Sequence, residues 1–124
     1  MSALEPKIVT LLAGNAVVSA LISTRIYPMI LPQDPTLPAI TYQRVSGGQI
    51  SSTDGFSNYE NPRIQIDSMA TTYAGAKAVA AAVFAAMELS TTFKAVPIGD
   101  TDIYEDEPEF YRVSMDFSVW HSTA

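Results

Sequence analysis

The chain has 124 residues, of which 48% are hydrophobic and 16% charged, and it contains no cysteine. This length fits one domain over residues 1–124, with a core that buries roughly two-thirds of the unfolded surface. The lack of cysteine excludes disulfides, thiol nucleophiles and cysteine-ligated zinc. The net charge of −6 disfavours binding to nucleic-acid phosphates. The low share of charged residues is compatible with burial of the surface in an assembly. No segment is expected to cross a membrane.

The N-terminal part predicts two helices followed by extended chain. Apolar residues recur at helical spacing over residues 3–13, and a second short helix is expected from Ala16 to Ile22. Arg25 to Pro28 reads as a short extended piece. The prolines that follow exclude helix and central strand from the next stretch, and they stand at positions 28, 32, 35 and 38.

Residues 39–46 and 63–70 read as strands, because apolar and polar residues alternate along them. The polar segment between them, Gly47 to Pro62, is expected to be a loop of about 15 residues, and loops of that length are usually functional or mobile. Candidate partner-contacting residues in this loop are Gly47, Gly48, Phe56 and Tyr59.

A long helix is predicted to begin after Thr71 or Thr72, either of which can cap it, and to end near Leu89. Its apolar face should contain the residues that recur at spacings of three and four, namely Tyr73, Ala76, Ala80, Val83, Phe84 and Met87. Phe93 to Val96 then reads as a short strand, and Asp100 to Glu109 as an acidic hairpin region broken by Pro108.

The C-terminal strand, Phe110 to Trp120, alternates without error. Its odd-numbered residues are apolar from Tyr111 to Val119, and the even-numbered residues from Arg112 to Ser118 are polar. Such alternation is typical of an antiparallel sheet with one buried face. The predicted fold is therefore α+β, an antiparallel sheet of about four strands with the long helix on one face and a short helical N-terminus.

Motifs for chemistry are missing from the sequence. No phosphate-binding glycine pattern and no zinc-binding histidine pair occurs, and the single histidine, His121, is expected to pack near Trp120. Its pairing with Asp116 would be a chance one. No catalytic, cofactor-binding or metal-binding residue is predicted, and the chain is expected not to be an enzyme. A small carboxylate-based hydrolase stays as an alternative from another class.

One acidic segment holds six of the 13 carboxylates and no basic residue, namely Asp100, Asp102, Glu105, Asp106, Glu107 and Glu109. A solvated hairpin, a negative surface with an electrostatic purpose, and a metal or carboxylate-pair site are all open. The residue order required for a calcium loop is absent. An acidic mimic of DNA would instead need carboxylates spread over a whole face.

Charged and aromatic residues on the predicted strands are candidates for contacts between subunits, namely Arg44, Arg63, Arg112, Asp116 and Trp120. Arg63 and Arg112 fall on polar strand faces, where they could pair with Asp67 and Asp116 inside the chain or with a neighbouring subunit. Trp120 and Phe110 lie at the two ends of the last strand, and either local packing or an interface would explain them.

The order of several segments resembles one family, the tail-completion or tail-terminator proteins of long-tailed bacteriophages, prophages and gene-transfer agents. The segments are Arg25 to Pro28, Leu31 to Gln33, Leu37 to Gly47, Arg63 to Asp67, Tyr73 to Ala76 and Tyr111 to His121. The resemblance implies a virion tail protein, assembled in the bacterial cytoplasm, that forms a ring, commonly a hexamer. The ring would cap the head-proximal end of the tail tube, stop its growth and offer a docking surface to the head–tail connector.

The same resemblance implies the tail tube protein and the connector protein as partners, DNA that passes through the ring without specific binding, and no cofactor. The acidic segment is hypothesised to line the lumen or a ring face, where like charge would keep DNA from sticking. The structural alternative is a head–tail connector subunit or a tail-tube-like subunit.

Overall fold

The computed structural model describes residues 4–33, 35–46, 49–52, 55–106 and 109–122. In chain order the elements are α1 (Leu4–Gly14), α2 (Ala16–Ile22), β1 (Ile26–Pro28), β2 (Ala39–Ser46), β3 (Gln49–Ser52), β4 (Gly55–Glu60), β5 (Arg63–Ala70), α3 (Tyr73–Glu88), β6 (Phe93–Asp106) and β7 (Glu109–Ser122). The predicted helices and the strands over residues 39–46 and 63–70 are confirmed, since hydrophobic periodicity locates them well.

The sheet is mixed and contains seven strands within the described residues. β7 pairs antiparallel with β5 and, near its end, with β4 on one side, and with β6 on the other. β2 follows β5, and β1 runs parallel to β2. The α+β class is thus confirmed. The expected antiparallel sheet of about four strands is matched only in part, because the sheet has more strands and β1 pairs with β2 in parallel, whereas the other pairs are antiparallel.

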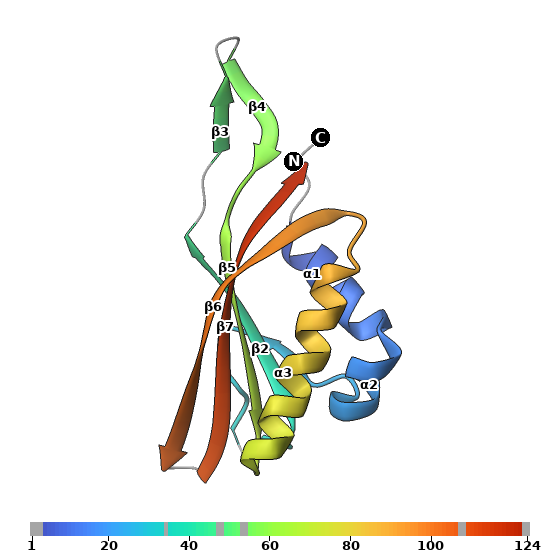
Figure 1. Cartoon of the computed structure of the whole chain (residues 1–124), viewed down its shortest axis with the longest axis vertical. Coiled ribbons are helices and arrows are strands. Elements are labelled where there is room, and N and C mark those ends of the chain that lie inside the picture. The colour runs from blue at the N-terminus through green and yellow to red at the C-terminus, as the bar shows by residue number, and fades with distance from the viewer. Residues whose placement is uncertain (1–3, 34, 47–48, 53–54, 107–108, 123–124) are drawn as a thin grey trace.

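The segment Gly47 to Pro62 contains a hairpin where a loop was expected, because β3 and β4 pair antiparallel. This hairpin continues the β2–β5 hairpin beyond the helices, at one end of the molecule (Figure 1). Gly47 and Gly48 lie outside the described residues. Phe56 and Tyr59 lie on β4, and their side chains are likewise outside what the structure describes.

The predicted short strand Phe93 to Val96 is only the first part of β6, which runs through the acidic residues to Asp106. The strand pairs with β7 over its whole length, with one irregularity between Pro97 and Gly99. Hydrogen bonds supplied by the partner strand thus override the weak strand propensity of the acidic stretch. The β6–β7 hairpin ends at the opposite end of the molecule from the β3–β4 hairpin (Figure 1).

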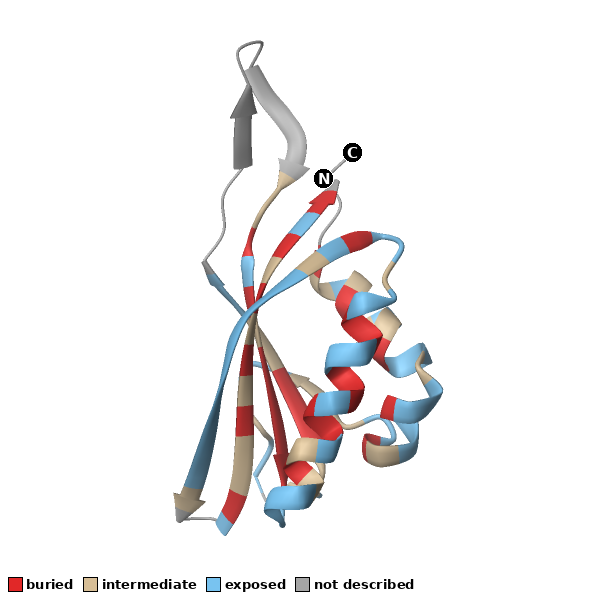
Figure 2. Cartoon of the chain, viewed as in Figure 1, coloured by how far each residue is buried: buried red, intermediate tan, exposed pale blue. Residues whose placement is uncertain are grey.

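All three helices lie on one face of the sheet, and their buried sides face the strands (Figure 2). Thr72 caps α3, since its Oγ1 accepts a hydrogen bond from the Gly75 N–H at 3.0 Å. On β7 the apolar residues turn inward as predicted, and Val113, Met115, Phe117 and Val119 are buried. This inner face therefore contains the core.

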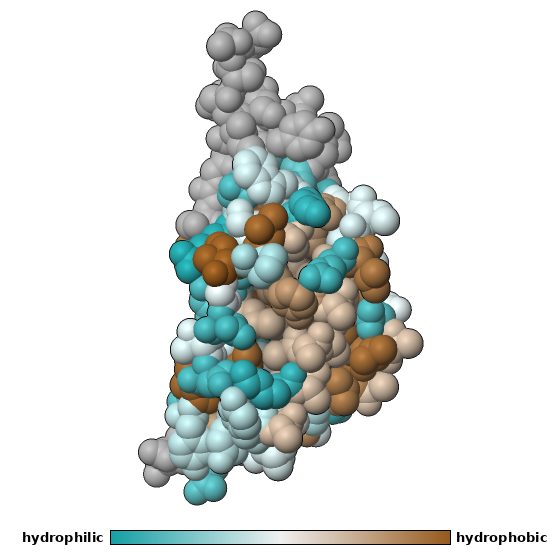
Figure 3. All heavy atoms as spheres, viewed as in Figure 1, coloured by the Kyte–Doolittle hydropathy of each residue, from teal (hydrophilic) through white to brown (hydrophobic). Residues whose placement is uncertain are grey.

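The apolar face of α3 is rotated slightly from the prediction. Its buried residues include Val79, Ala82 and Ala86 in addition to those expected. Tyr73 and Phe84 therefore lie at the border of the buried stripe, with 49% and 37% of their surface exposed. The outward side of α3 presents alanines, and Figure 3 shows a broad pale-brown area over this helix.

Among the described residues no single helix is long and apolar enough to cross a membrane. Of the described helices, only α1 and α2 taken together have the length and apolar composition of a membrane-spanning segment, and the chain bends by 84° between them. In the structure, Leu4, Ile8 and Leu12 of α1 are buried in the core.

Candidate interaction surfaces

The outer face of the sheet, which points away from the helices, contains two sets of ion pairs. Arg63 Nη2 lies 2.7 Å from Asp116 Oδ2. Arg112 lies between two carboxylates, 3.4 Å from Asp67 and 3.5 Å from Glu105. These guanidinium groups therefore have intrachain partners, which was one of the two predicted possibilities, and their role in contacts between subunits stays a prediction.

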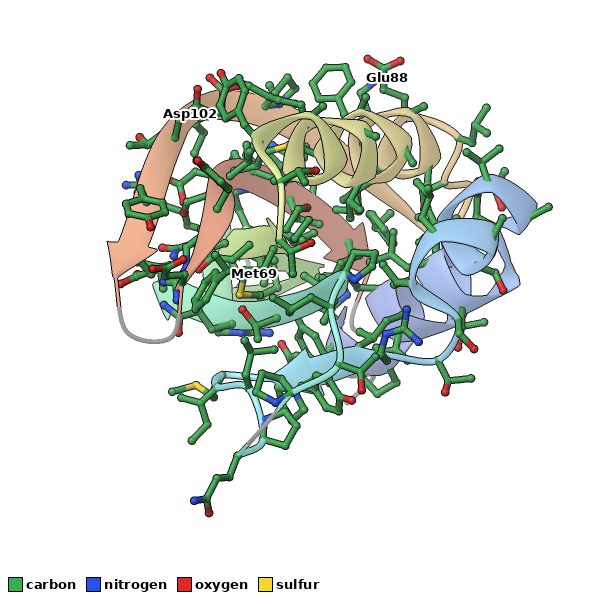
Figure 4. All side chains as sticks on the ribbon, turned by 90° about the horizontal axis from the view of Figure 1, so that it is seen from below. Met69, Glu88 and Asp102 are labelled. Atoms are coloured by element: carbon green, nitrogen blue, oxygen red, sulfur yellow. The ribbon has the colours of Figure 1, made fainter. Side chains whose placement is uncertain are left out.

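A cleft of about 890 Å³ opens between the proline-rich segment, residues 29–33 and 35–37, and the part of the outer face near the β6–β7 hairpin. We call it the Met29 cleft. Its apolar side includes Met29, Ile30, Met69 and Phe110, and its polar side includes Thr41, Asp67, Glu105, Glu109 and Arg112. Figure 4 shows Met69 among the strands near the proline-rich segment.

Phe110 is buried although it belongs to the otherwise polar face of β7, with 5% of its surface exposed. Its ring lies under the Arg112 guanidinium, 5.7 Å from the ring centre to Cζ, which is cation–π distance. Phe110 is thus buried within its own subunit and packs against Arg112, so local packing explains it. Trp120, at the other end of the strand, stays 45% exposed.

The acidic segment is divided between the two faces of β6 because successive strand residues point to opposite sides. Asp102 faces α3, where its carboxylate accepts hydrogen bonds from Lys77 Nζ at 2.8 Å and from the Tyr73 hydroxyl at 2.7 Å (Figure 4). Glu105 lies opposite Phe110 on the outer face. The side chains of Asp106 and Glu107 are outside the described part. The described carboxylates thus form no single wall on one face.

Ion pairing between α3 and β6 shifts the pKa values of two side chains, Asp102 and Lys77. The Lys77 ammonium lowers the pKa of Asp102, and the Tyr73 hydroxyl adds to that effect. In return, the Asp102 carboxylate raises the pKa of Lys77. Tyr73 also packs edge-on against Tyr111, with 6.0 Å between ring centres, and Tyr104 lies 5.0 Å from Tyr111. This exposed aromatic group joins α3 to the β6–β7 hairpin.

A buried histidine, His121, lies at the base of the β3–β4 hairpin. Nothing in the sequence indicated that it would lie there. His121 is 2% exposed, and its Nε2 is 2.7 Å from Glu60 Oε1. Its Nδ1 is 3.3 Å from Lys7 Nζ. An ammonium only donates, so Nδ1 accepts and Nε2 carries the proton that is donated to Glu60. The expectation that His121 merely packs near Trp120 therefore missed its polar partners.

Arg44 extends this cluster to the N-terminal helix. Its guanidinium donates to both oxygens of Glu60, at 3.0 and 3.1 Å, and to Glu5 at 2.8 Å. The bidentate bond from Arg44 and the bond from His121 lower the pKa of Glu60. The Glu60 and Glu5 carboxylates in turn raise the pKa of Arg44. The cluster ties α1 to the ends of β2, β4 and β7.

A second exposed group lies on the outer face at the end of the sheet remote from the Met29 cleft. Lys94 is opposite Trp120 in the β6–β7 register, and Val96 follows two residues later. Trp120 and Val96 are 45% and 44% exposed. No ion pair joins Lys94 to a described carboxylate. We call Lys94, Val96 and Trp120 the Lys94 patch.

Within the described residues, no three histidine or carboxylate side chains are grouped so that they could hold a metal ion. The distinguishing features of the molecule are instead its surfaces: two hairpins at opposite ends, an open cleft and an exposed cationic-aromatic patch. They define a small α+β protein with several exposed surfaces that suit contact with other proteins.

The chain belongs to the family described as Tail completion protein gp17, whose model matches residues 6–122. A chain from a solved structure titled "Virion of native gene transfer agent (GTA) particle" has the same fold, with a TM-score of 0.68 and 21% sequence identity over 93% of this chain and 91% of that one. No curated protein matches the sequence. The resemblance read from the sequence is thus confirmed, and the protein is a structural assembly component of a phage-type virion tail.

Proposed function

We propose that residues 1–124 act as one domain, that six copies form a ring, and that this ring caps the head-proximal end of the tail tube. A tube stops growing when its last ring meets a subunit that matches it on one side and cannot template another ring on the other. Such a cap needs two unlike surfaces. The observation that carries the proposal is the pair of hairpins at opposite ends of the molecule, β3–β4 at one end and the acidic β6–β7 hairpin at the other.

In this proposal one hairpin end contacts the tail tube protein and the other offers the docking surface to the head–tail connector protein. Assembly takes place in the cytoplasm of the bacterial host. The family membership supports a place in the tail, and the unlike ends support a position between two different partners.

DNA passes through the ring without specific binding. The net charge of −6 and the exposed Asp100 and Asp102 support a surface that repels phosphates. Neutralising Asp100 and Asp102, which lie on the same face of β6, should then slow DNA ejection. Unchanged ejection, with these residues mapped to the outer rim of the ring, would contradict this part of the proposal.

Electron microscopy of particles made without this protein tests the main proposal. Tails of uncontrolled length, or tails without heads, are expected, and the native gene supplied in trans should restore particles of normal length. Normal tails on normal heads would overturn it. A purified protein that polymerises into long open tubes would indicate a tube subunit instead of a cap.

A further inference from the structure

The Met29 cleft has an excess of negative charge. Three carboxylates border it, those of Asp67, Glu105 and Glu109, against the single guanidinium of Arg112. Arg112 divides its two contacts between Asp67 and Glu105 at 3.4 and 3.5 Å, both longer than a close charged hydrogen bond. One cation shared in this way leaves the cleft favourable for a second one supplied from outside.

The opposite side of the cleft is apolar and open. Met29 and Ile30 are 63% and 77% exposed. Met29 has a positive φ of 67°, which is costly for a side chain of this kind, and its N–H donates to the Tyr42 carbonyl at 2.9 Å. The backbone therefore holds two large apolar side chains in solvent beside a charged cleft. An occupant that suits both sides has an apolar group and a cation close together.

The Lys94 patch has this chemistry. It offers the Lys94 ammonium, for which the described residues provide no carboxylate, next to the exposed side chains of Trp120 and Val96. Tryptophan is among the residue types enriched at the anchors of protein interfaces. Cation and apolar groups on the patch thus match carboxylates and apolar groups in the cleft.

The patch cannot reach the cleft of its own subunit. Arg112 and Trp120 are eight residues apart on β7, a distance of roughly 26 Å at 3.3 Å per residue. Figure 1 shows β6 on one side of β7 in the lower half of the molecule and on the other side in the upper half, so the paired ribbon is strongly twisted. The outer face therefore points in different directions at its two ends, which suits a head-to-tail contact between copies.

We propose that the Met29 cleft of one subunit receives the Lys94 patch of the next copy, so that Lys94 meets Glu105 and Glu109 while Trp120 packs against Met29 and Ile30. The inference rests on the ring proposed above and names the contact that closes it.

Because the chain contains no cysteine, a pair of introduced cysteines can report this contact inside assembled tails. The double variant Ile30→Cys/Val96→Cys, oxidised in purified particles, should give a ladder of disulfide-linked multimers on a non-reducing gel. A matched control is Ile30→Cys/Leu89→Cys, since Leu89 is also well exposed, at 69%, but lies outside the patch. A ladder from the control that equals the one from the test pair, or none from the test pair, would overturn the contact.

Charge reversal tests the same contact through assembly. Glu105→Lys and Lys94→Glu each turn the attraction between positions 94 and 105 into repulsion at every contact, so each variant alone should lose the ring and the ability to complete tails. When the two variants are co-expressed in equal amounts, every contact between unlike copies has opposite charges again, and rings should return. Asp100→Lys makes the same charge change on the opposite face of β6 and should leave ring formation intact.

The outcomes separate the contact from the proposed function. If both reversals assemble normally, or if the mixture fails while each variant unfolds at the native urea concentration, the contact is wrong and the cap can stand. If particles without the protein have normal tails, the proposed function fails whatever the cysteine pair shows.

Discussion

Glu60 Oε1 lies 2.7 Å from Nε2 of the buried His121, and the same carboxylate receives both terminal nitrogens of Arg44. These bonds fix the place where the β3–β4 hairpin leaves the body of the molecule. Glu5 and Lys7 bring α1 to the same place. The position of the hairpin is thus coupled to the N-terminal helix.

Glu60→Ala should destabilise the protein by about 1.5–3 kcal/mol, the usual contribution of a hydrogen bond to a charged group, because His121 and Arg44 lose their acceptor. The measurement is urea unfolding followed by tryptophan fluorescence. Glu60→Gln keeps an acceptor for one of the two partners, so its free energy of unfolding should lie between those of Glu60→Ala and the native protein. A Glu60→Ala variant that unfolds at the native urea concentration would show that the cluster contributes nothing.

Acid should weaken this cluster selectively. The pKa of Glu60 is below its ordinary value of 4.5 because of the bonds from Arg44 and His121. A carboxylate with a lowered folded pKa contributes stability that is complete above the ordinary value and is lost as the pH falls through the folded value. The free energy of unfolding of the native protein should therefore fall more steeply below pH 4.5 than that of Glu60→Gln. Parallel curves for the two proteins would contradict the assignment.

The sequence predicted the elements whose pattern is local. The alternation of β7 and the periodicity of α3 located both, because one buried face dictates residue type at each step. The β3–β4 hairpin was missed because its glycine, serine and asparagine residues read as loop. Most of β6 was missed because its pairing depends on β7, which follows it in the chain. The His121 cluster draws residues from four elements, and no sequence spacing reveals that.

Gly75→Ala tests the cap of α3. Alanine in place of glycine normally stabilises a helix by roughly 0.5–1 kcal/mol. Here an added Cβ would lie 2.8 Å from Thr72 Oγ1 and 3.1 Å from the Cβ of Ala70. Thr72 would have to leave its capping bond, so the variant should be less stable than native by thermal unfolding. Thr72→Ala alone should lower the free energy of unfolding by about 1 kcal/mol. Adding Gly75→Ala to the Thr72→Ala variant should cause little further loss of stability. A Gly75→Ala variant with a raised Tm would contradict the clash.

Phe117 and Phe84 offer a matched pair for the core. Their rings pack together with 6.4 Å between centres, but Phe117 is 2% exposed and Phe84 is 37% exposed. Phe117→Ala should cost about 3–5 kcal/mol, because it leaves a cavity between the sheet and α3. Phe84→Ala should cost much less, since solvent can fill the space it leaves. Urea unfolding measures both values, provided that the dependence of the unfolding free energy on urea concentration is unchanged. Equal costs for the two variants would mean that α3 does not pack on β7 as described.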